Sequence, residues 1–232
     1  MKLYYIFFLP FVYCFNIKKF VGTSLLGSSL FFNNIQPSIA YPQQPPIINQ
    51  NTGNSAKILI ERNNIYFYGS VTPQSCEELK NKLNEMNYNG RLFKIGYKSN
   101  PPPINLHIQS GGGSLLNSLY IVDLIESSET PVNTYVDGYS ASAASLLSVV
   151  GNKRYMTKNS MILVHQLSSE NQGKFQELDD DMKNLQQLMD KVKKIYLMHS
   201  NLQYLQLDDL LQHDLWLDAE TCKKYGLVDE II

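Results

Sequence analysis

The fold class is decided by the stretch Ile104-Asn105-Leu106-His107-Ile108-Gln109-Ser110-Gly111-Gly112-Gly113-Ser114. Apolar and polar residues alternate from Ile104 to Ile108, which predicts a half-buried strand. The glycine run predicts a turn, and apolar residues then follow at helical spacing, namely Leu115, Leu119 and Val122. A strand-to-helix turn of this kind exposes backbone N–H groups that can bind a phosphate or a developing oxyanion. Most such turns only connect two elements, and the sequence has neither GxGxxG nor a P-loop here.

Strand and helix patterns alternate on both sides of this stretch. Short β-rich runs predict further strands at residues 57–60, 64–69, 132–136, 154–156, 161–165 and 227–231. Helical patterns open at Pro73, Leu115, Ala141 and Phe175, and a short one follows Trp216. Asn89-Gly90 and Pro101-Pro102-Pro103 predict a long loop after the first helix. Alternating strands and helices favour an α/β protein with a mostly parallel sheet of βαβ units.

The helix predicted from Phe175 to about Ser200 is unusually long and amphipathic. It is too long to pack fully on one small α/β domain. We therefore expect it to be an arm that packs on something else.

Composition excludes several classes of protein. The chain has 232 residues, of which 44% are hydrophobic and 18% charged, with a net charge of −1. The charge balance argues against a dominant nucleic-acid-binding surface. No apolar run is long enough for a membrane span, so we expect none in the mature form. Three cysteines (Cys14, Cys76 and Cys222) and four scattered histidines show no metal-binding spacing, and we expect neither a metal nor a cofactor on this chain.

The first part of the chain has the composition of a targeting segment. No acidic residue precedes Glu61, and an apolar run extends from Leu3 to Phe15. A signal-like run before a basic, acid-free stretch resembles the two-part presequence of proteins imported into complex plastids. A mitochondrial presequence and a simple secretory signal are the alternatives. We therefore expect a presequence at 1–32, a disordered Asn-, Gln- and Pro-rich linker at 33–56, and a folded domain at 57–232.

Two further features could carry chemistry. Asp137-Gly138-Tyr139-Ser140 is predicted as a turn into the helix that opens at Ala141, and a serine such as Ser142 can be exposed there. The pattern is not the GxSxG nucleophile elbow, because Ser142 stands where that motif has its second glycine. His165 ends an apolar strand and becomes interesting only beside a nucleophile and a carboxylate. The nearby carboxylates Asp179, Asp180 and Asp181 are interpreted as a solvated helix face. Spacing alone does not choose among the candidate carboxylates, which are Asp208, Asp209, Asp214 and Asp218.

Several motifs together resemble the proteolytic subunit family of the Clp protease (ClpP). They are Gly112-Gly113, Gly138-x-x-Ala141-Ser142, Val164-His165-Gln166, Asp214-Leu215-Trp216-Leu217-Asp218-Ala219 and Tyr225-Gly226-Leu227-Val228-Asp229. The match covers about residues 57–232 and keeps order and spacing. It implies a ClpP/crotonase-like α/β fold of repeated β-β-α units with a long protruding handle helix. It also implies an ATP-dependent serine endopeptidase that cleaves unfolded proteins and peptides by acyl-enzyme chemistry.

The resemblance assigns roles to five residues. Ser142 would be the nucleophile, His165 the general base, and Asp214 the carboxylate that orients the imidazole. The backbone N–H groups of Gly112 and Ala143 would form the oxyanion hole.

The chain departs from the family at other positions. Gly111 and Leu167 stand where prolines are usual, and Ala144 where a glycine is common; these departures leave the three side chains in place. Asn105 and His107 occupy positions where aromatic residues usually line the chaperone docking pocket. The resemblance therefore supports chaperone docking less strongly than it supports the catalytic residues.

The resemblance also implies partners. Two heptameric rings of ClpP-type subunits would meet through the long helix and the segment Ser168–Lys174 before it. An AAA+ Clp chaperone ATPase would feed protein substrates into the chamber, and the ATP would be bound by that partner. Two alternatives remain: a catalytically silent ring subunit, and an acyl-CoA enzyme of the related crotonase fold.

Overall fold

The structure, a computed structural model, describes residues 57–232. The predicted presequence (1–32) and linker (33–56) lie outside the described residues, and the predicted start of the folded domain at residue 57 stays a prediction.

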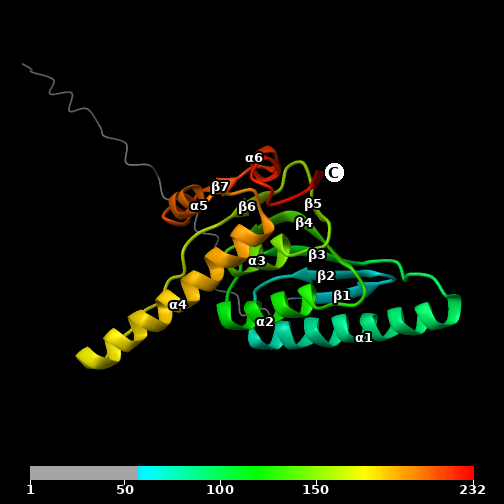
Figure 1. The fold of residues 1–232 in the computed structure, drawn as a ribbon, viewed down its shortest axis with the longest axis horizontal. Helices are drawn as coiled ribbons and strands as arrows, with labels where there is room; N and C mark the ends of the chain where they lie inside the picture. The colour runs from blue at the N-terminus through cyan, green and yellow to red at the C-terminus, as the bar shows by residue number, and fades with distance from the viewer. Residues whose placement is uncertain (1–56) are drawn as a thin grey trace, which may run out of the picture. The chain divides into compact units, whose positions relative to one another are not determined.

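One sheet organises the described part of the chain (Figure 1). A first hairpin, β1 (Lys57–Glu61) and β2 (Asn64–Tyr68), is antiparallel and turns at Arg62, which has a φ of 56°. From β2 the sheet continues in parallel through β3 (Ile104–Ser110), β4 (Val132–Ala141), β5 (Arg154–Met156) and β8 (Glu230–Ile231). The prediction of a mostly parallel α/β sheet is therefore confirmed.

The long strand β4 pairs with β3 along one edge and with two shorter strands, one after the other, along the opposite edge. Its first half pairs with β5, and its last residues pair with β6 (Met161–Leu163). Strand β7 (Trp216–Leu217) then pairs antiparallel with β6. This short three-strand corner carries the residues of the candidate site.

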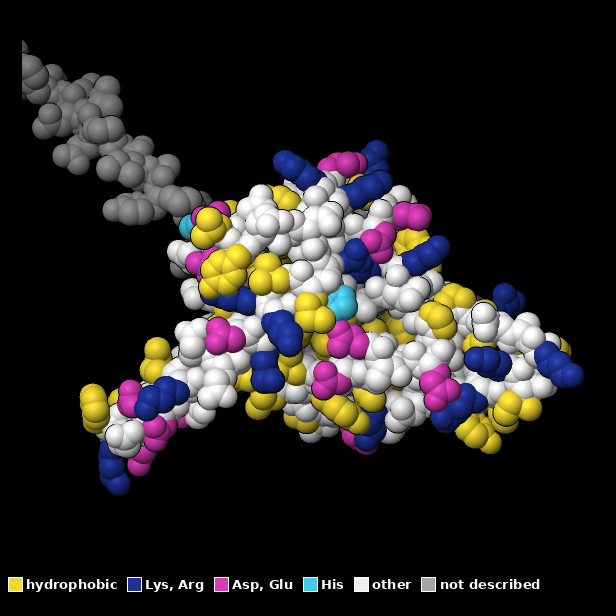
Figure 2. All heavy atoms as spheres, viewed as in Figure 1, with side chains coloured by type: hydrophobic (Ala, Val, Ile, Leu, Met, Phe, Trp, Pro, Cys, Tyr) yellow, Lys and Arg dark blue, Asp and Glu magenta, His cyan; other side chains and the backbone are white. Residues whose placement is uncertain are grey.

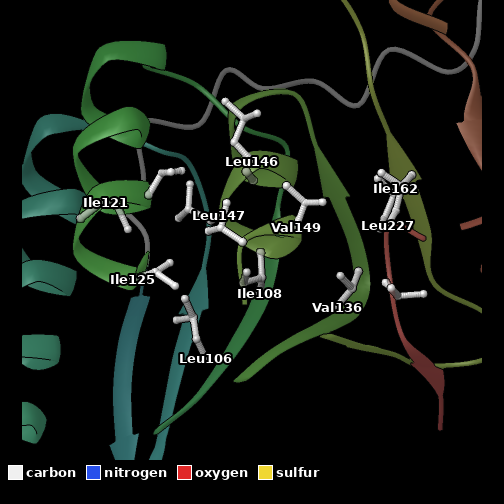
Figure 3. Packing of buried hydrophobic residues seen from close by; sticks show 14 of the residues in the cluster. Leu106, Ile108, Ile121, Ile125, Val136, Leu146, Leu147, Val149, Ile162 and Leu227 are labelled. Carbon is white, nitrogen blue, oxygen red and sulfur yellow. The ribbon is translucent and has the colours of Figure 1, made fainter. Parts of the chain in front are cut away.

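Three helices cover one face of the sheet: α1 (Pro73–Tyr97), α2 (Leu115–Glu126) and α3 (Ala143–Val149). The core lies between them and the sheet, where Ile121 and Leu147 face Leu106 and Ile108 of β3 (Figure 3). Burial alternates strictly along β3, as the sequence predicted. Each fully buried Leu or Ile side chain contributes about 1.5–3 kcal/mol to folding.

The opposite face of the sheet carries a stack of rings. His107 lies between Tyr66 and Tyr135, with centroids 4.7 and 4.6 Å away, and Tyr135 stacks on Tyr155 at 4.6 Å. His107 Nδ1 and the Tyr68 hydroxyl both contact Asp137 Oδ2 at 2.8 Å. The face is therefore aromatic with a polar centre.

Helix α1 is longer than the sequence predicted. The expected loop at Asn89-Gly90 is wrong, because α1 continues through both residues to Tyr97. A Cβ on Gly90 would lie 2.2 Å from Thr130 Oγ1. The glycine therefore serves close packing inside the helix, where it is tolerated at a cost of about 1 kcal/mol. The helix begins where expected, with Pro73 after the Thr72 cap.

Strand β4 is also longer than predicted. The expected turn at residues 137–140 is wrong, because the strand runs on to Ala141. Gly138 has a φ of +88°, and the register shifts there from the pair Ile108–Val136 to the pair Ser110–Ser140. Gly138 thus marks a bulge within a continuing strand.

Helix α4 (Phe175–His199) is the predicted long helix and extends away from the sheet (Figure 1). Only Val192 and Tyr196, near its end, are buried. Charged side chains and exposed hydrophobic ones alternate on the projecting part (Figure 2). Two short helices, α5 (Tyr204–Leu211) and α6 (Ala219–Lys224), complete the chain. Within residues 57–232, no helix combines the length and the apolar character needed to cross a membrane.

Candidate active site

Ser142 stands at the point where β4 ends and α3 begins. It has φ 55° and ψ −130°, a conformation that residues other than glycine rarely adopt. Its N–H donates to the carbonyl of Leu163 in β6 at 3.0 Å, and its carbonyl accepts from Ser145 N–H at 3.0 Å. Such backbone strain persists only where the surroundings hold it, and it concentrates at functional sites.

The glycine loop packs directly against this turn. Gly112 has a φ of +91°, and a Cβ there would lie 2.7 Å from Ser142 Cβ and 2.6 Å from the Ala141 carbonyl oxygen. No other residue type fits at Gly112 without moving the Ser142 turn.

His165 and Asp214 meet because β6 and β7 are paired. Leu163 of β6 lies opposite Trp216 of β7, and the two functional residues lie two positions beyond on each side. His165 Nδ1 and Asp214 Oδ1 are 2.8 Å apart. An ionised carboxylate accepts from Nδ1–H, which leaves His165 Nε2 free to take a proton.

Ser142 and His165 line one cavity of about 170 Å³. Within residues 57–232, no hydrogen bond joins their side chains. The remaining wall comes from the glycine loop, the start of α3, the segment after His165 and the buried end of α4, namely Gly113, Leu115, Ala143, Leu146, Gln166, Leu167, Ser168, Val192 and Tyr196.

Two backbone N–H groups point to an oxyanion site. Ala143 is the first residue of α3, and N–H groups of a first helical turn have no acceptor within the helix. The Gly112 N–H donates to Ser110 Oγ at 3.1 Å, so it is already engaged. Gly113, not Gly112, lines the cavity, and its N–H has no hydrogen-bond partner among the described residues. The sequence reasoning did not choose Gly113, although it belongs to the same glycine run.

Three other aspartates near the site in sequence are engaged elsewhere. Asp218 caps α6 by accepting from Thr221 N–H at 2.8 Å, and this hydrogen bonding lowers the pKa of Asp218. Asp208 pairs with Lys193 at 2.6 Å, and Asp179 with Lys183 at 2.6 Å. Among the candidates, the structure brings only Asp214 to His165.

The neighbouring serines have different surroundings from Ser142. Ser140 is fully buried, and its hydroxyl has no partner among the described residues. Ser145 Oγ donates to the Ser142 carbonyl at 2.5 Å. Residues 57–232 contain no cluster of three or more His, Cys, Asp or Glu side chains placed to hold a metal ion.

Comparison with known proteins gives the family and the fold of the chain. The sequence profile of the Clp protease family matches residues 51–232, so the chain belongs to the Clp protease family. A solved structure of a point mutant of ClpP1 from Listeria monocytogenes superposes with a TM-score of 0.63 at 23% sequence identity. The superposition covers 73% of this chain and 91% of that one, and it confirms the predicted ClpP fold.

Proposed function

We propose that the chain is a serine endopeptidase subunit of the ClpP type, with Ser142, His165 and Asp214 as its catalytic residues. The observation that supports this most is the 2.8 Å contact between His165 Nδ1 and Asp214 Oδ1 at the wall of the cavity that Ser142 lines. The membership of the Clp protease family supports the same reaction class.

The chemistry follows the order Ser, His, Asp. Ser142 Oγ attacks the peptide carbonyl carbon, and its proton passes to His165 Nε2. The C–N bond then breaks, the proton moves to the leaving amine, and an acyl-enzyme remains on Ser142. Water, deprotonated by the same imidazole, hydrolyses the ester. Asp214 holds the ring in the required tautomer and stabilises the imidazolium.

The oxyanion of each tetrahedral intermediate would bind between two N–H groups. Ala143 is one donor. For the second donor, the N–H of Gly113 is better placed than the N–H of Gly112, because the Gly112 N–H already donates to Ser110 Oγ. Two donors aimed at the developing charge typically contribute more than any other single group of the site.

Assembly into two stacked heptameric rings is supported by α4. Phe175 and Met182 are 86% and 67% exposed, although both lie on an apolar stripe of the helix. A second ring would cover this stripe and close a chamber around Ser142.

A closed chamber needs a partner that unfolds and delivers proteins, which we propose to be an AAA+ Clp chaperone that binds the ATP. The open face of the sheet would receive it. Asn105 and His107 stand in that face, but Tyr66, Tyr135 and Tyr155 keep it aromatic.

The decisive experiment is labelling with a fluorophosphonate probe, which reacts with activated serines. We expect labelling at Ser142 and loss of both labelling and peptide cleavage in Ser142→Ala. The variant should keep its melting temperature, because only one Oγ at a turn is removed. Removal of a triad member typically lowers the rate by several orders of magnitude.

Each other result points to a different function. An unlabelled protein that still forms rings would be a silent ring subunit. An unlabelled protein that binds acyl-CoA would be a crotonase-type enzyme. Full activity in Ser142→Ala would move the assignment to Ser140 or Ser145.

For the location we propose import into a complex plastid, with the mitochondrion as the alternative. The N-terminus of the mature protein, read by mass spectrometry, tests this. A two-step removal of residues up to about 32 supports a plastid, and an uncleaved chain contradicts any presequence.

A further inference from the structure

A chain of hydrogen bonds runs from α4 to the backbone of Ser142. Tyr196 comes from the buried end of α4, and its side chain is only 2% exposed. Its hydroxyl lies 2.6 Å from Ser145 Oγ, and that Oγ lies 2.5 Å from the carbonyl oxygen of Ser142. The projecting helix is thereby linked to the strained turn.

The direction of these bonds follows from the groups involved. A carbonyl oxygen only accepts, so the single proton of the Ser145 hydroxyl must go to Ser142. Tyr196 must then donate to Ser145. Burial raises the pKa of Tyr196 well above its ordinary value, so the donor stays protonated. A hydroxyl that accepts one hydrogen bond becomes a stronger donor in the next, so Tyr196 strengthens the bond to Ser142.

The orientation of the Ser142 carbonyl also determines the orientation of the Ala143 N–H. It shares one planar peptide unit with the N–H of Ala143, and the two bonds point in opposite directions. Anything that fixes the carbonyl therefore fixes the direction of that N–H. The strained ψ of −130° at Ser142 favours rotation of the unit toward a more populated conformation, and the Ser145 hydroxyl opposes this rotation together with the Ser145 N–H, which donates to the same carbonyl at 3.0 Å.

We propose that Tyr196 and Ser145 are positioning residues that aim the Ala143 N–H at the oxyanion. The proposal rests on the proposed peptidase function, because the oxyanion forms only in that reaction. An interaction made only in the transition state raises kcat and leaves substrate binding nearly unchanged.

The test compares Ser145→Ala and Tyr196→Phe with the wild-type protein in peptide cleavage. We expect Ser145→Ala to lower kcat about fivefold to thirtyfold, less than the loss of a whole oxyanion donor. Tyr196→Phe should lower it less, because the bond from Ser145 remains. KM should stay within about twofold. The double variant should resemble Ser145→Ala alone, because the two residues act in series.

Ser148→Ala is the matched control. Ser148 lies in the same helix, is 1% exposed, and donates to the carbonyl of Ser145 at 2.9 Å, but it has no contact with the Ser142 carbonyl. This control should lose a comparable amount of melting temperature and keep its kcat.

Two further readouts separate positioning from a merely structural role. The affinity for a peptide boronate, which mimics the tetrahedral intermediate, should fall in parallel with kcat. The pH midpoint of kcat/KM should not move, because the hydroxyl chain does not touch His165 or Asp214.

The outcomes are distinct. If the wild-type protein is not labelled by the fluorophosphonate, the peptidase function itself fails. If it is labelled and both variants cleave at the wild-type rate, only the positioning role is overturned. An equal loss of kcat in Ser148→Ala also overturns it. If Tyr196→Phe does not fold, Ser145→Ala against Ser148→Ala decides alone.

Discussion

At the scale of single residues, the site depends on one carboxylate among several. Asp214 contacts His165, but its side chain is 70% exposed, whereas Asp218 caps α6 and Asp208 pairs with Lys193. Exposure weakens its field through solvent screening. We therefore predict that its role is mainly to orient the imidazole.

Asp214→Asn should lower kcat/KM by several orders of magnitude, because an amide favours the wrong tautomer of His165. Steady-state cleavage of a fluorogenic peptide measures the effect. Asp218→Asn is the control: the asparagine side chain can still accept from Thr221 N–H and caps a helix about as well as aspartate, so both the stability and the rate should change little. Equal rate losses in the two variants would contradict the assignment of Asp214.

Another carboxylate gives a pH-dependent contribution to stability. Burial by itself raises the pKa of Asp229, but hydrogen bonds from the Arg154 side chain and backbone outweigh it and hold the pKa below 3.8. A lowered folded-state pKa means that the stabilisation is present above about pH 4 and is lost as the pH falls further.

Asp229→Asn should therefore lower the stability by about 1 kcal/mol at pH 7, a modest value because the carboxylate is 41% exposed. The difference in melting temperature from the wild type should shrink as the pH falls below about 4. Asp209→Asn, at an 80% exposed side chain, should show no difference at either pH. A difference for Asp229→Asn that persists unchanged at pH 3 would exclude the ion pair as its cause.

At the scale of elements, the sequence predicted what periodicity controls. The alternation in β3 comes from one buried face, and the 3–4 spacing in α4 from an apolar stripe that is buried only near the end of the helix; both elements were predicted correctly. The end of α1 and the length of β4 were not predicted. Gly90 and Gly138 read as turn residues, yet their role is set by Thr130 and by a bulge opposite β3, contacts that no local pattern contains. Helix α5 was missed because its eight residues are too few to show a period.

The residues of the candidate site were also only partly predictable from the sequence. Ser142, His165 and Asp214 were chosen from the family resemblance; the structure places Ser142 and His165 at one cavity and Asp214 against His165, and their roles stay predictions. Spacing alone could not select Asp214, because its position depends on the pairing of β6 with β7. The sequence could not choose Gly113 over Gly112 as the oxyanion donor, because that choice depends on the hydrogen bond that the Gly112 N–H donates to Ser110 Oγ.

Helix α4 provides an element-scale test of assembly. Leu185 and Val192 belong to the apolar stripe that the sequence predicts for this helix, but Val192 is buried in its own chain and lines the site cavity. An Asp there would disturb the core. Met182 is the better probe because it is exposed and apolar.

Met182→Asp should lower the mass of the assembly, measured by light scattering, and leave the melting temperature of the single chain nearly unchanged. Gln187→Asp adds the same charge to another side of the projecting helix and should leave the mass unchanged. A fully active monomer in the wild type would contradict the ring and, with it, the need for an unfolding partner.

At the scale of the whole molecule, one helix joins the surface proposed for assembly to the candidate site. The same helix that presents Met182 to the outside presents Val192 and Tyr196 to the site cavity. The exposed and the buried ends of α4 belong to one continuous element. We therefore expect a displacement of the arm to reach the turn that holds Ser142 through Tyr196 and Ser145.

The chain has one tryptophan, Trp216, and its position makes it an optical probe of that coupling. It lies in β7, two residues after Asp214, and packs edge-on against Tyr139 with ring centroids 6.3 Å apart. Its fluorescence therefore comes entirely from the corner of the sheet that carries the candidate site. We expect the emission maximum to shift when a fluorophosphonate reacts with Ser142, and to shift again on dilution that separates the rings. Before any dilution, Met182→Asp should already show the emission spectrum of the diluted wild-type protein. An emission maximum that neither acylation nor dilution shifts would show that the corner stays rigid. A single indole thus allows acylation and assembly to be followed in real time without an added dye.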